Sequence, residues 1–338
     1  FIDEARALVG FSYTFTPTVR LPGGGSEVFE PATGQGADFT GPFTFPTHRY
    51  SRSELQKTGS TTYVLTNPDG SKLTFGRRTG SAGSYRYFLT EMADPSGNAV
   101  TLGYDGSERL TSITDALGQV TTLDYDLVGD TLKITKVTDP FDRYATFEYD
   151  GSGRLETITD VIGIESEFTY QSTSDFIDSL TTPYGTSTFA FGVGVVSGRD
   201  RWLEITDPLG DKERIESRSE WSEAPVDGAA PTGMSTYGGA SGYRNTLYWD
   251  KKAWKEKPND PAAARITHWL HTTLNETSGT PENIKNPLES TRIWYNYEGQ
   301  GTSSIEGTSS RPTKIGRVLD DSSEQIYTYE YNSFGRVT

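Results

Sequence analysis

A pattern built around aspartate recurs along this chain, and it limits the possible fold more than any other sequence feature. In four consecutive copies, apolar residues stand five and two positions before the aspartate, another stands eight positions after it, and a tyrosine stands ten positions after it. The anchoring aspartates are Asp94, Asp115, Asp139 and Asp160. Their spacings of 21, 24 and 21 residues, with no gap inside any copy, indicate a structural repeat.

Each copy predicts a β-hairpin. Alternation such as that from Phe147 to Tyr149 places large side chains on one face of a strand. The aspartate can bond the backbone two residues on, and a glycine three residues after it accepts a positive φ, so this step predicts the turn. The predicted turn residues are Asp94, Gly97, Asp115, Gly118, Asp139, Asp160, Gly163, Asp207 and Gly210. The predicted core tyrosines are Tyr104, Tyr125, Tyr149, Tyr170 and Tyr331.

A second connection follows the tyrosine and carries a recurrent arginine. It runs from Asp150 to Arg154 in one copy, and the apolar residue after the arginine begins the next hairpin. The arginine could bond carbonyl groups or pair with the aspartate of a neighbouring unit. In a last copy, Asp321 precedes Tyr331 by ten residues, and Val337 should begin a further strand. We therefore expect the chain to stop inside a repeat.

These hairpins predict an all-β fold with little or no helix. A single hairpin is marginally stable in water, whereas stacked hairpins share a continuous sheet and bury a common face. We expect an array of antiparallel hairpins that forms an extended sheet, curved by its glycines and turns.

The run from Tyr149 through Arg154 to Leu155, followed by an Asp-x-x-Gly hairpin and another tyrosine, resembles the YD repeat. That repeat is the signature of the Rhs-repeat family, which includes bacterial Rhs proteins, the cocoon subunits of insecticidal Tc toxins and teneurins. The resemblance covers residues 62–218 and again 312–338. It implies a spiralling sheet that forms part of a hollow shell, which in many bacterial members encloses a C-terminal toxin. It also implies a secreted or cell-surface protein whose partner is the remainder of its own polypeptide, including any effector cargo.

The family's self-cleavage motif does not appear in this sequence. The stretches from Asp94 to Gly97 and from Asp207 to Gly210 are superficially similar, but they stand in the hairpin register and predict turns. About eight units are present, which is too few to close a shell by the family's pattern. Neither an autoprotease nor a toxin domain is assigned.

The repeat divides the chain into four segments. Residues 1–61 predict degenerate leading strands and loops, 62–218 the hairpin repeats, 219–311 an insertion or atypical hairpins, and 312–338 a further, truncated repeat. The third segment is rich in tryptophan. Within it, Asp260 followed by proline predicts a helix start, but the alternation from Ile266 to Leu270 predicts a strand equally well.

Clustered aromatic side chains in residues 219–311 leave three interpretations open. They could fill a local core, stack on a sugar ring, or contact another protein. The candidate surface residues are Trp249, Trp254 and Trp269. They carry the alternative function, a cell-surface adhesion or carbohydrate-binding module.

The composition and the remaining motifs point away from an enzyme. The chain has no cysteine, which excludes a thiol nucleophile and a zinc–thiolate site. The net charge of −15 disfavours nucleic acid, and no apolar stretch is long enough to span a membrane. His268 and His271 would share a helix face but lack further ligands, and three aspartates near Asp126 lack the calcium-loop pattern. We therefore predict no catalytic, cofactor or metal site.

Overall fold

The computed structural model of the chain describes residues 1–9, 12–21, 24–29, 42–48, 50–81, 84–194, 200–218, 229–234, 244–273, 276–301, 304–332 and 335–338. Nearly all of the regular structure in these residues is β-strand, which confirms the predicted fold class. The chain divides into two compact units, residues 1–147 with 333–336 and residues 148–332 with 337–338, called unit 1 and unit 2 below. Among the described residues, no helix has the length and apolar character needed to cross a membrane.

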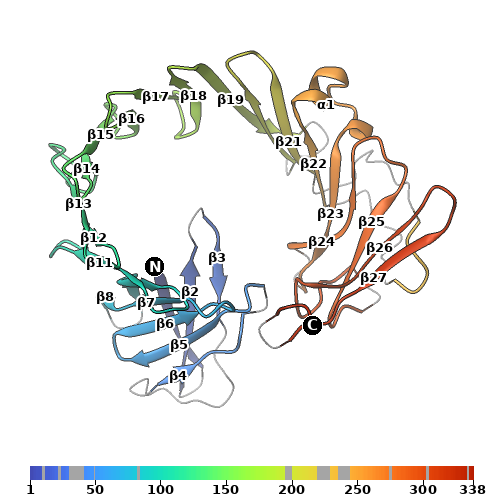
Figure 1. Ribbon diagram of the computed structural model, residues 1–338, viewed down its shortest axis with the longest axis horizontal. Helices are drawn as coiled ribbons and strands as arrows, with labels where there is room; N and C mark the ends of the chain where they lie inside the picture. Colours follow the sequence, from blue (N-terminus) through green and yellow to red (C-terminus); the bar gives the residue numbers. More distant parts are fainter. Residues whose placement is uncertain are drawn as a thin grey trace. The chain divides into compact units, whose positions relative to one another are not determined.

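Unit 1 contains two antiparallel sheets, drawn in blue to green in Figure 1. The first sheet has the strand order β3 (Ser26–Val28), β2 (Ser12–Arg20), β1 (Ile2–Val9), β9 (Ser84–Phe88) and β8 (Arg77–Ser81). The second follows the chain order β4 (Phe43–Thr44), β5 (Glu54–Gly59), β6 (Thr62–Thr66), β7 (Lys72–Phe75), β10 (Glu91–Ala93), β11 (Ala99–Tyr104), β12 (Leu110–Thr114), β13 (Val120–Asp124), β14 (Lys136–Thr138) and β15 (Tyr144–Tyr149).

The core of unit 1 lies between these sheets. It is formed by buried residues from β1, β2 and β9 of the first sheet, from β4 to β7 of the second and from the connections near them: Ile2, Val19, Phe29, Phe43, Phe45, Leu55, Tyr63, Leu65, Phe75 and Tyr87. A charged pair is buried inside this core, because Lys57 Nζ lies 2.6 Å from Glu4 Oε2 and each residue is only 3% exposed. The segment 1–61 thus supplies six of the ten residues of a packed core that its weak sequence pattern did not predict.

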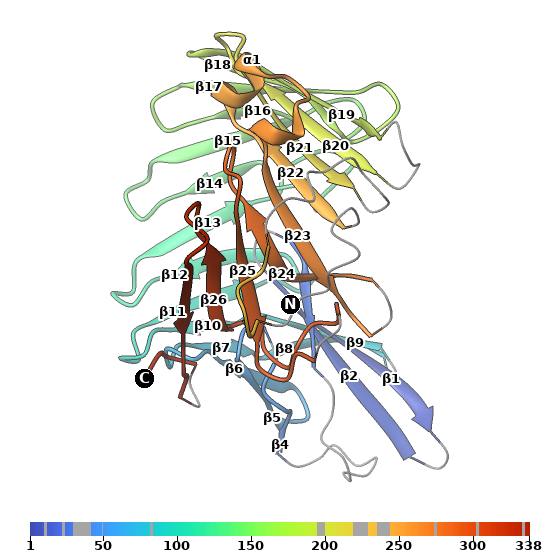
Figure 2. The same cartoon turned by 90° about the vertical axis from the view of Figure 1, so that its right-hand side faces the viewer.

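Unit 2 is one antiparallel sheet whose strands pair in chain order (Figures 1 and 2). Its strands are β16 (Leu155–Thr159), β17 (Glu165–Tyr170), β18 (Ile177–Thr182), β19 (Gly185–Val193), β20 (Arg201–Thr206), β21 (Lys212–Arg218), β22 (Asn245–Trp249), β23 (Arg265–His271), β24 (Thr277–Lys285), β25 (Arg292–Tyr297), β26 (Pro312–Val318) and β27 (Glu324–Thr328).

Two short helices lie in the connection between β22 and β23, which pair directly with each other. Helix α1 (Lys251–Glu256) begins at Asp250, whose carboxylate accepts the Ala253 N–H, and the sequence pattern did not predict it. Asp260 caps the 3-10 helix η1 (Pro261–Ala263), and β23 follows directly. Both alternatives for this stretch are therefore partly correct: the cap starts a single helical turn, and the alternating residues form a strand.

The repeat strands separate an apolar face from a polar one. In the register of β17 and β18, Phe168 stands opposite Leu180, whereas Glu167 stands opposite Thr181. The same alternation in unit 1 pairs Leu123 with Val137. Leu123 is buried, but most apolar residues of the repeats are only half-buried, because a single sheet layer covers them on one side.

The register of the last hairpin differs from the expectation. Its turn runs from Leu319 to Ser323, joined by the bond from the Leu319 N–H to the Ser323 carbonyl, with Ser322 at φ 66°. The anchoring position is therefore Leu319 and not Asp321. The arms of this hairpin are longer than in the other copies, so counting back from Tyr331 gave the wrong anchor. Val337 forms a single bridge with Tyr331.

Candidate functional site: the repeat connections and the tryptophan-rich segment

The Asp-x-x-Gly turns share one hydrogen-bond pattern. At Asp160, carboxylate Oδ1 accepts the backbone N–H groups of Ile162 at 2.8 Å and Ile164 at 2.9 Å. Gly163 has φ +81° and donates its N–H to the Asp160 carbonyl. The equivalent pairs of donors are Ser96 and Asn98 at Asp94, Leu117 and Gln119 at Asp115, Phe141 and Arg143 at Asp139, and Leu209 and Asp211 at Asp207.

Glycine at the third position of these turns meets a backbone requirement. Gly97, Gly118 and Gly210 share the positive φ of Gly163. Asp142 takes this position in the turn that begins at Asp139, with φ 62°. Aspartate tolerates this region better than most side chains, which accounts for the absence of glycine from the turn at Asp139.

The second connection repeats the same turn and adds an ion pair. Asp150 Oδ1 accepts the N–H groups of Ser152 and Arg154, each at 2.9 Å, and Oδ2 accepts the Arg154 Nε–H at 2.8 Å. Asp105 makes the same three bonds to Ser107 and Arg109. The pKa of each aspartate lies below its usual value. The main cause is the hydrogen bond from the arginine backbone N–H to the carboxylate, and the bond from the guanidinium lowers the pKa further.

The repeat tyrosines close each hairpin at its base. The Tyr104, Tyr125 and Tyr170 hydroxyls donate to the carbonyls of Leu89, Leu110 and Leu155, at 2.7, 2.6 and 2.7 Å. In each case the acceptor begins the same hairpin, fifteen residues earlier. These rings are half-buried, so their hydroxyls, and not burial alone, define their place. Tyr149 is half-buried at the end of β15, and Tyr331 donates to the Pro312 carbonyl at 2.8 Å.

Tyr297 belongs to the same set, although the sequence reasoning missed it. It is buried at the end of β25, and its hydroxyl donates to the Pro281 carbonyl at 2.6 Å. Burial raises the pKa of Tyr297. The signal was present, because Tyr297-Glu298-Gly299 imitates the Tyr-Asp-Gly step of the repeat.

The recurrent arginine joins one hairpin to the next. The Arg154 guanidinium lies 4.6 Å from the ring centroid of Tyr170, and Nη1 donates to the Ser174 carbonyl at 3.0 Å. Arg109 lies 4.9 Å from the ring centroid of Tyr125 and donates to the Thr131 carbonyl at 2.8 Å. The arginine therefore bonds carbonyls of the following connection, and its ion pair is with the aspartate of its own turn.

This combination of turns, tyrosines and arginines coincides with a known family. The RHS Repeat model matches residues 88–120 and 130–161, where these connections are most regular. These two stretches of the chain are RHS repeats. No curated protein matches the chain.

Three solved structures that match this chain are larger than it. One is the crystal structure of TcdB2-TccC3-TEV, at 12% identity and a TM-score of 0.35, covering 96% of this chain and 18% of that one. Another is a Tc holotoxin pore of Photorhabdus luminescens, at 13% identity and a TM-score of 0.31, covering 96% of this chain and 17% of that one. A third, TcdB2-TccC3-Cdc42, has 11% identity and a TM-score of 0.28, covering 97% and 23%. The Rhs-repeat chain described here therefore spans about a fifth of their length.

The tryptophan-rich segment of this Rhs-repeat chain forms a local core. Trp249 is 0% exposed, and its Nε1–H donates to the Asp260 carbonyl at 2.8 Å. It packs with Leu247, Ala263, Ala264 and Ile266, and its ring meets Trp254 edge-on at 5.6 Å between centroids. This corrects the surface role expected for Trp249, because its indole presents no face for a sugar to stack on.

The other two candidate residues, Trp254 and Trp269, are half-buried and contact other residues of the chain. Trp254 faces the Arg214 guanidinium at 5.3 Å from its ring centroid, and Trp202 faces the same group at 4.1 Å. Trp269 donates its Nε1–H to Thr246 Oγ1 at 2.9 Å. Trp249 and Trp254 are thus brought together, and their contacts dock α1 on the sheet.

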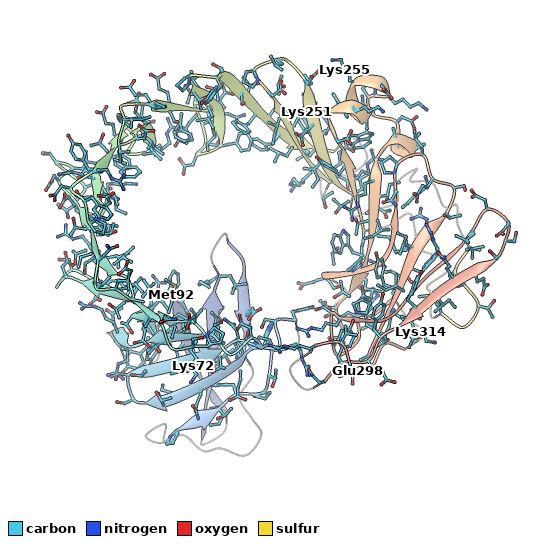
Figure 3. All side chains as sticks on the ribbon, viewed as in Figure 1. Lys72, Met92, Lys251, Lys255, Glu298 and Lys314 are labelled. Atoms are coloured by element: carbon cyan, nitrogen blue, oxygen red, sulfur yellow. The ribbon has the colours of Figure 1, made fainter. Side chains whose placement is uncertain are left out.

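The lysines of α1 hold the helix against a repeat turn. Lys251 Nζ lies 2.6 Å from Asp207 Oδ2, and Lys255 Nζ lies 2.8 Å from Asp211 Oδ1 (Figure 3 labels both lysines). The basic side chains near Trp254 therefore serve an internal contact. Asp207 in addition anchors its turn, so one carboxylate organises both elements.

The two histidines lie on β23 with separate partners. His268 is buried, with Nε2 3.2 Å from Glu282 Oε2 and Nδ1 3.2 Å from Asn245 Oδ1. His271 Nε2 lies 2.5 Å from Ser304 Oγ. They do not share the helix face that their spacing suggested. Within the described part of the chain, no group of three His, Cys, Asp or Glu side chains could hold a metal ion.

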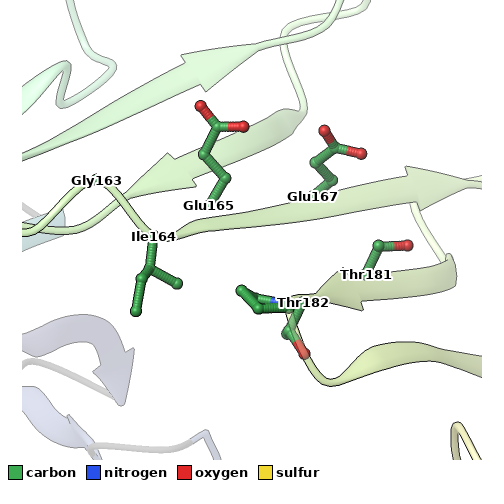
Figure 4. A pocket seen from close by; sticks show the side chains of 7 residues that line it. Gly163, Ile164, Glu165, Glu167, Thr181 and Thr182 are labelled. Atoms are coloured by element: carbon green, nitrogen blue, oxygen red, sulfur yellow. The ribbon is translucent and has the colours of Figure 1, made fainter.

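A shallow pocket lies along β17 and β18 and is lined by Gly163, Ile164, Glu165, Glu167, Thr181, Thr182 and Pro183. Figure 4 shows Glu165, Glu167 and Thr181 pointing to one side of the strands, and Ile164 and Thr182 to the other. Both glutamates are exposed. The pocket therefore follows the ordinary alternation of the hairpins and has no buried polar group that would define a site.

Proposed function

We propose that this chain is a structural segment of a larger Rhs-repeat protein and forms part of the wall of a shell. The observation that carries this proposal is the arginine connection. Arg154 bonds its own turn through Asp150 and the next connection through Ser174 and Tyr170, so consecutive hairpins are linked into a continuous sheet. In this proposal the contacts of Arg154 strengthen the wall and take part in no chemical reaction.

In this proposal the partner is the remainder of the same polypeptide, with a C-terminal toxin or effector as cargo. The protein is secreted or displayed at the cell surface, as the family implies. The tryptophans that would support adhesion or sugar binding are engaged with Asp260, Arg214 and Thr246, so the wall role has the stronger support.

Protease protection of the complete natural polypeptide tests this proposal. A segment beyond the repeats should resist a soluble protease in the whole protein and be cleaved when expressed alone. Combining Asp150→Ala with Arg154→Ala should open the wall and expose that segment, whereas the exposed-site control Ser172→Ala should not. Equal cleavage of the segment in the whole protein and alone would overturn the proposal, as would a polypeptide with nothing beyond its repeats.

A further inference from the structure

The buried side of β24 and β25 carries a lysine that lacks a partner. Lys285 is only 2% exposed, and in the part of the chain that the structure describes it has no hydrogen bond and no ion pair from its side chain. Lysine is almost never buried in this way unless it is paired, because removing an ammonium group from water is costly. This position therefore requires a compensating negative charge.

A second donor without an acceptor lies on the same strand. Asn283 is 0% exposed, and its Nδ2 has no hydrogen-bond partner. Its Oδ1 accepts a hydrogen bond from Arg292 Nη1 at 2.7 Å. A guanidinium group can only donate, so this bond fixes which amide atom faces Arg292 and leaves Nδ2 as the donor without an acceptor. Such buried donors are rare in proteins, and each one needs an explanation.

The three side chains occupy neighbouring places on one side of the sheet. Lys285 stands directly opposite Arg292 in the register of β24 and β25. Asn283 precedes Lys285 by two residues, about 6.8 Å along the strand, so both side chains point to the same side. Like charges that stand directly opposite each other destabilise a sheet. A single acceptor with a negative charge would offset this repulsion and satisfy both donors.

The acidic residue on this stretch of β24 contacts a different group. Glu282 Oε2 lies 3.2 Å from His268 Nε2, and His268 stands opposite Asn283 on β23. Lys285 is therefore not the partner of Glu282. A water molecule could accept from the Asn283 amide, but it would leave the charge of Lys285 uncompensated. The two donors together thus call for an anion.

We propose that Lys285 and Asn283 bind a small monovalent anion, chloride, beside Arg292. One negative charge balances the one ammonium group that lacks a partner. A monatomic ion also needs little room, which suits a site whose three side chains are 0–2% exposed. The ion accepts hydrogen bonds from Lys285 Nζ and Asn283 Nδ2 and stabilises the pairing of β24 with β25.

Unfolding in matched salts tests this proposal. Sodium chloride and sodium methanesulfonate at equal ionic strength screen charges equally, so only a specific anion site separates their effects. The thermal midpoint of the chain should be higher in chloride, and the difference should grow with the logarithm of the chloride concentration once the site is saturated. Equal midpoints in the two salts at every concentration would overturn the proposal.

Two lysine variants locate the effect. Lys285→Met nearly keeps the length of the side chain and removes its charge, so chloride should no longer raise the midpoint above that in methanesulfonate. In methanesulfonate this variant should be at least as stable as the unmodified chain, because it buries no unpaired charge. The control Lys252→Met removes an exposed lysine of α1 and should keep the full chloride response. Equal chloride responses of the two variants would contradict the proposed site.

Bromide locates the ion in the unmodified chain, without any substitution. Crystals grown in sodium bromide should show an anomalous peak within hydrogen-bond distance of Lys285 Nζ and Asn283 Nδ2. An anomalous map without bromide at this position would also overturn the proposal. None of these results bears on the proposed wall role, which protease protection tests.

Discussion

At the scale of single residues, a hydroxyl group explains why tyrosine and not phenylalanine ends each repeat. The ring is half-buried, which any large apolar residue could achieve. Only tyrosine supplies a donor for the leucine carbonyl that begins the hairpin. By bonding this carbonyl, the hydroxyl fixes the base of the hairpin.

We expect Tyr125→Phe to lower the free energy of unfolding by about 0.5–1.5 kcal/mol, the usual net value of one hydrogen bond. The change removes the 2.6 Å bond to the Leu110 carbonyl and keeps the ring in place. Urea denaturation followed by circular dichroism measures the difference. Tyr184→Phe, at an exposed turn tip, is the matched control and should cost nothing. Equal effects of the two changes would contradict the proposed role of the hydroxyl.

The turn glycines allow a test of the backbone alone. Gly163 has φ +81° and Gly151 does not have a positive φ, and a Cβ at either would meet no atom within 4 Å. Gly163→Ala should therefore destabilise the protein by about 1–2 kcal/mol, because the left-handed region is costly for L-residues. Gly151→Ala should be neutral or slightly stabilising. Thermal unfolding compares the two variants, and a neutral Gly163→Ala would show that the turn can relax.

At the scale of elements, the connection from one hairpin to the next depends on ionised aspartates. Asp105 and Asp150 have folded pKa values below the unfolded value of about 4, chiefly because the arginine backbone N–H bonds the carboxylate. A lowered folded pKa contributes stability that is complete above the unfolded pKa. That contribution is lost as the pH falls through the folded pKa.

The stability of the protein should accordingly change little from pH 7 to pH 5 and fall below about pH 4. Combining Asp105→Asn with Asp150→Asn should lower the urea midpoint at pH 7 and flatten its decrease in acid, since asparagine does not titrate. Urea titrations at a series of pH values measure both effects. An acid decrease as steep in the double variant as in the unmodified chain would assign it to other carboxylates.

The sequence predicts those elements whose contacts join residues that are close together in the chain. The repeat hairpins depend on turn bonds spanning four residues, such as those of Asp160, and on strand alternation. The burial of Trp249 depends on α1 and η1 folding back over β22, and no periodic sequence pattern indicates that contact. The hydrogen bonds of the repeat tyrosines could not be predicted from the sequence, because they depend on the strand pairing that places Leu110 beside Tyr125.

At the scale of the whole chain, the two units have cores of different kinds. Unit 1 buries aromatic and aliphatic residues between two sheets, together with Glu4 and Lys57, which are 53 residues apart in sequence. The Tyr63 and Tyr87 hydroxyls also bond the Glu4 carboxylate. Unit 2 buries tryptophan and its neighbours beneath two short helices. A contact between distant residues such as Glu4 and Lys57 leaves no periodic signal, which is why the sequence pattern did not reveal the first core.

The buried pair and the tryptophans together allow each unit to be followed separately. Lys57→Met leaves the Glu4 carboxylate without its cation, and removing one partner of a buried pair costs about 3–5 kcal/mol.

All six tryptophans lie between residues 202 and 294, within unit 2, so their fluorescence reports that unit alone, whereas circular dichroism reports both. We expect Lys57→Met to lower the urea midpoint seen by circular dichroism and to move the fluorescence midpoint much less. Adding Glu4→Gln should recover part of the loss, because the amide is uncharged and can still bond the two tyrosine hydroxyls. If both probes shifted equally, the units would unfold as one, and the buried pair would stabilise the whole chain.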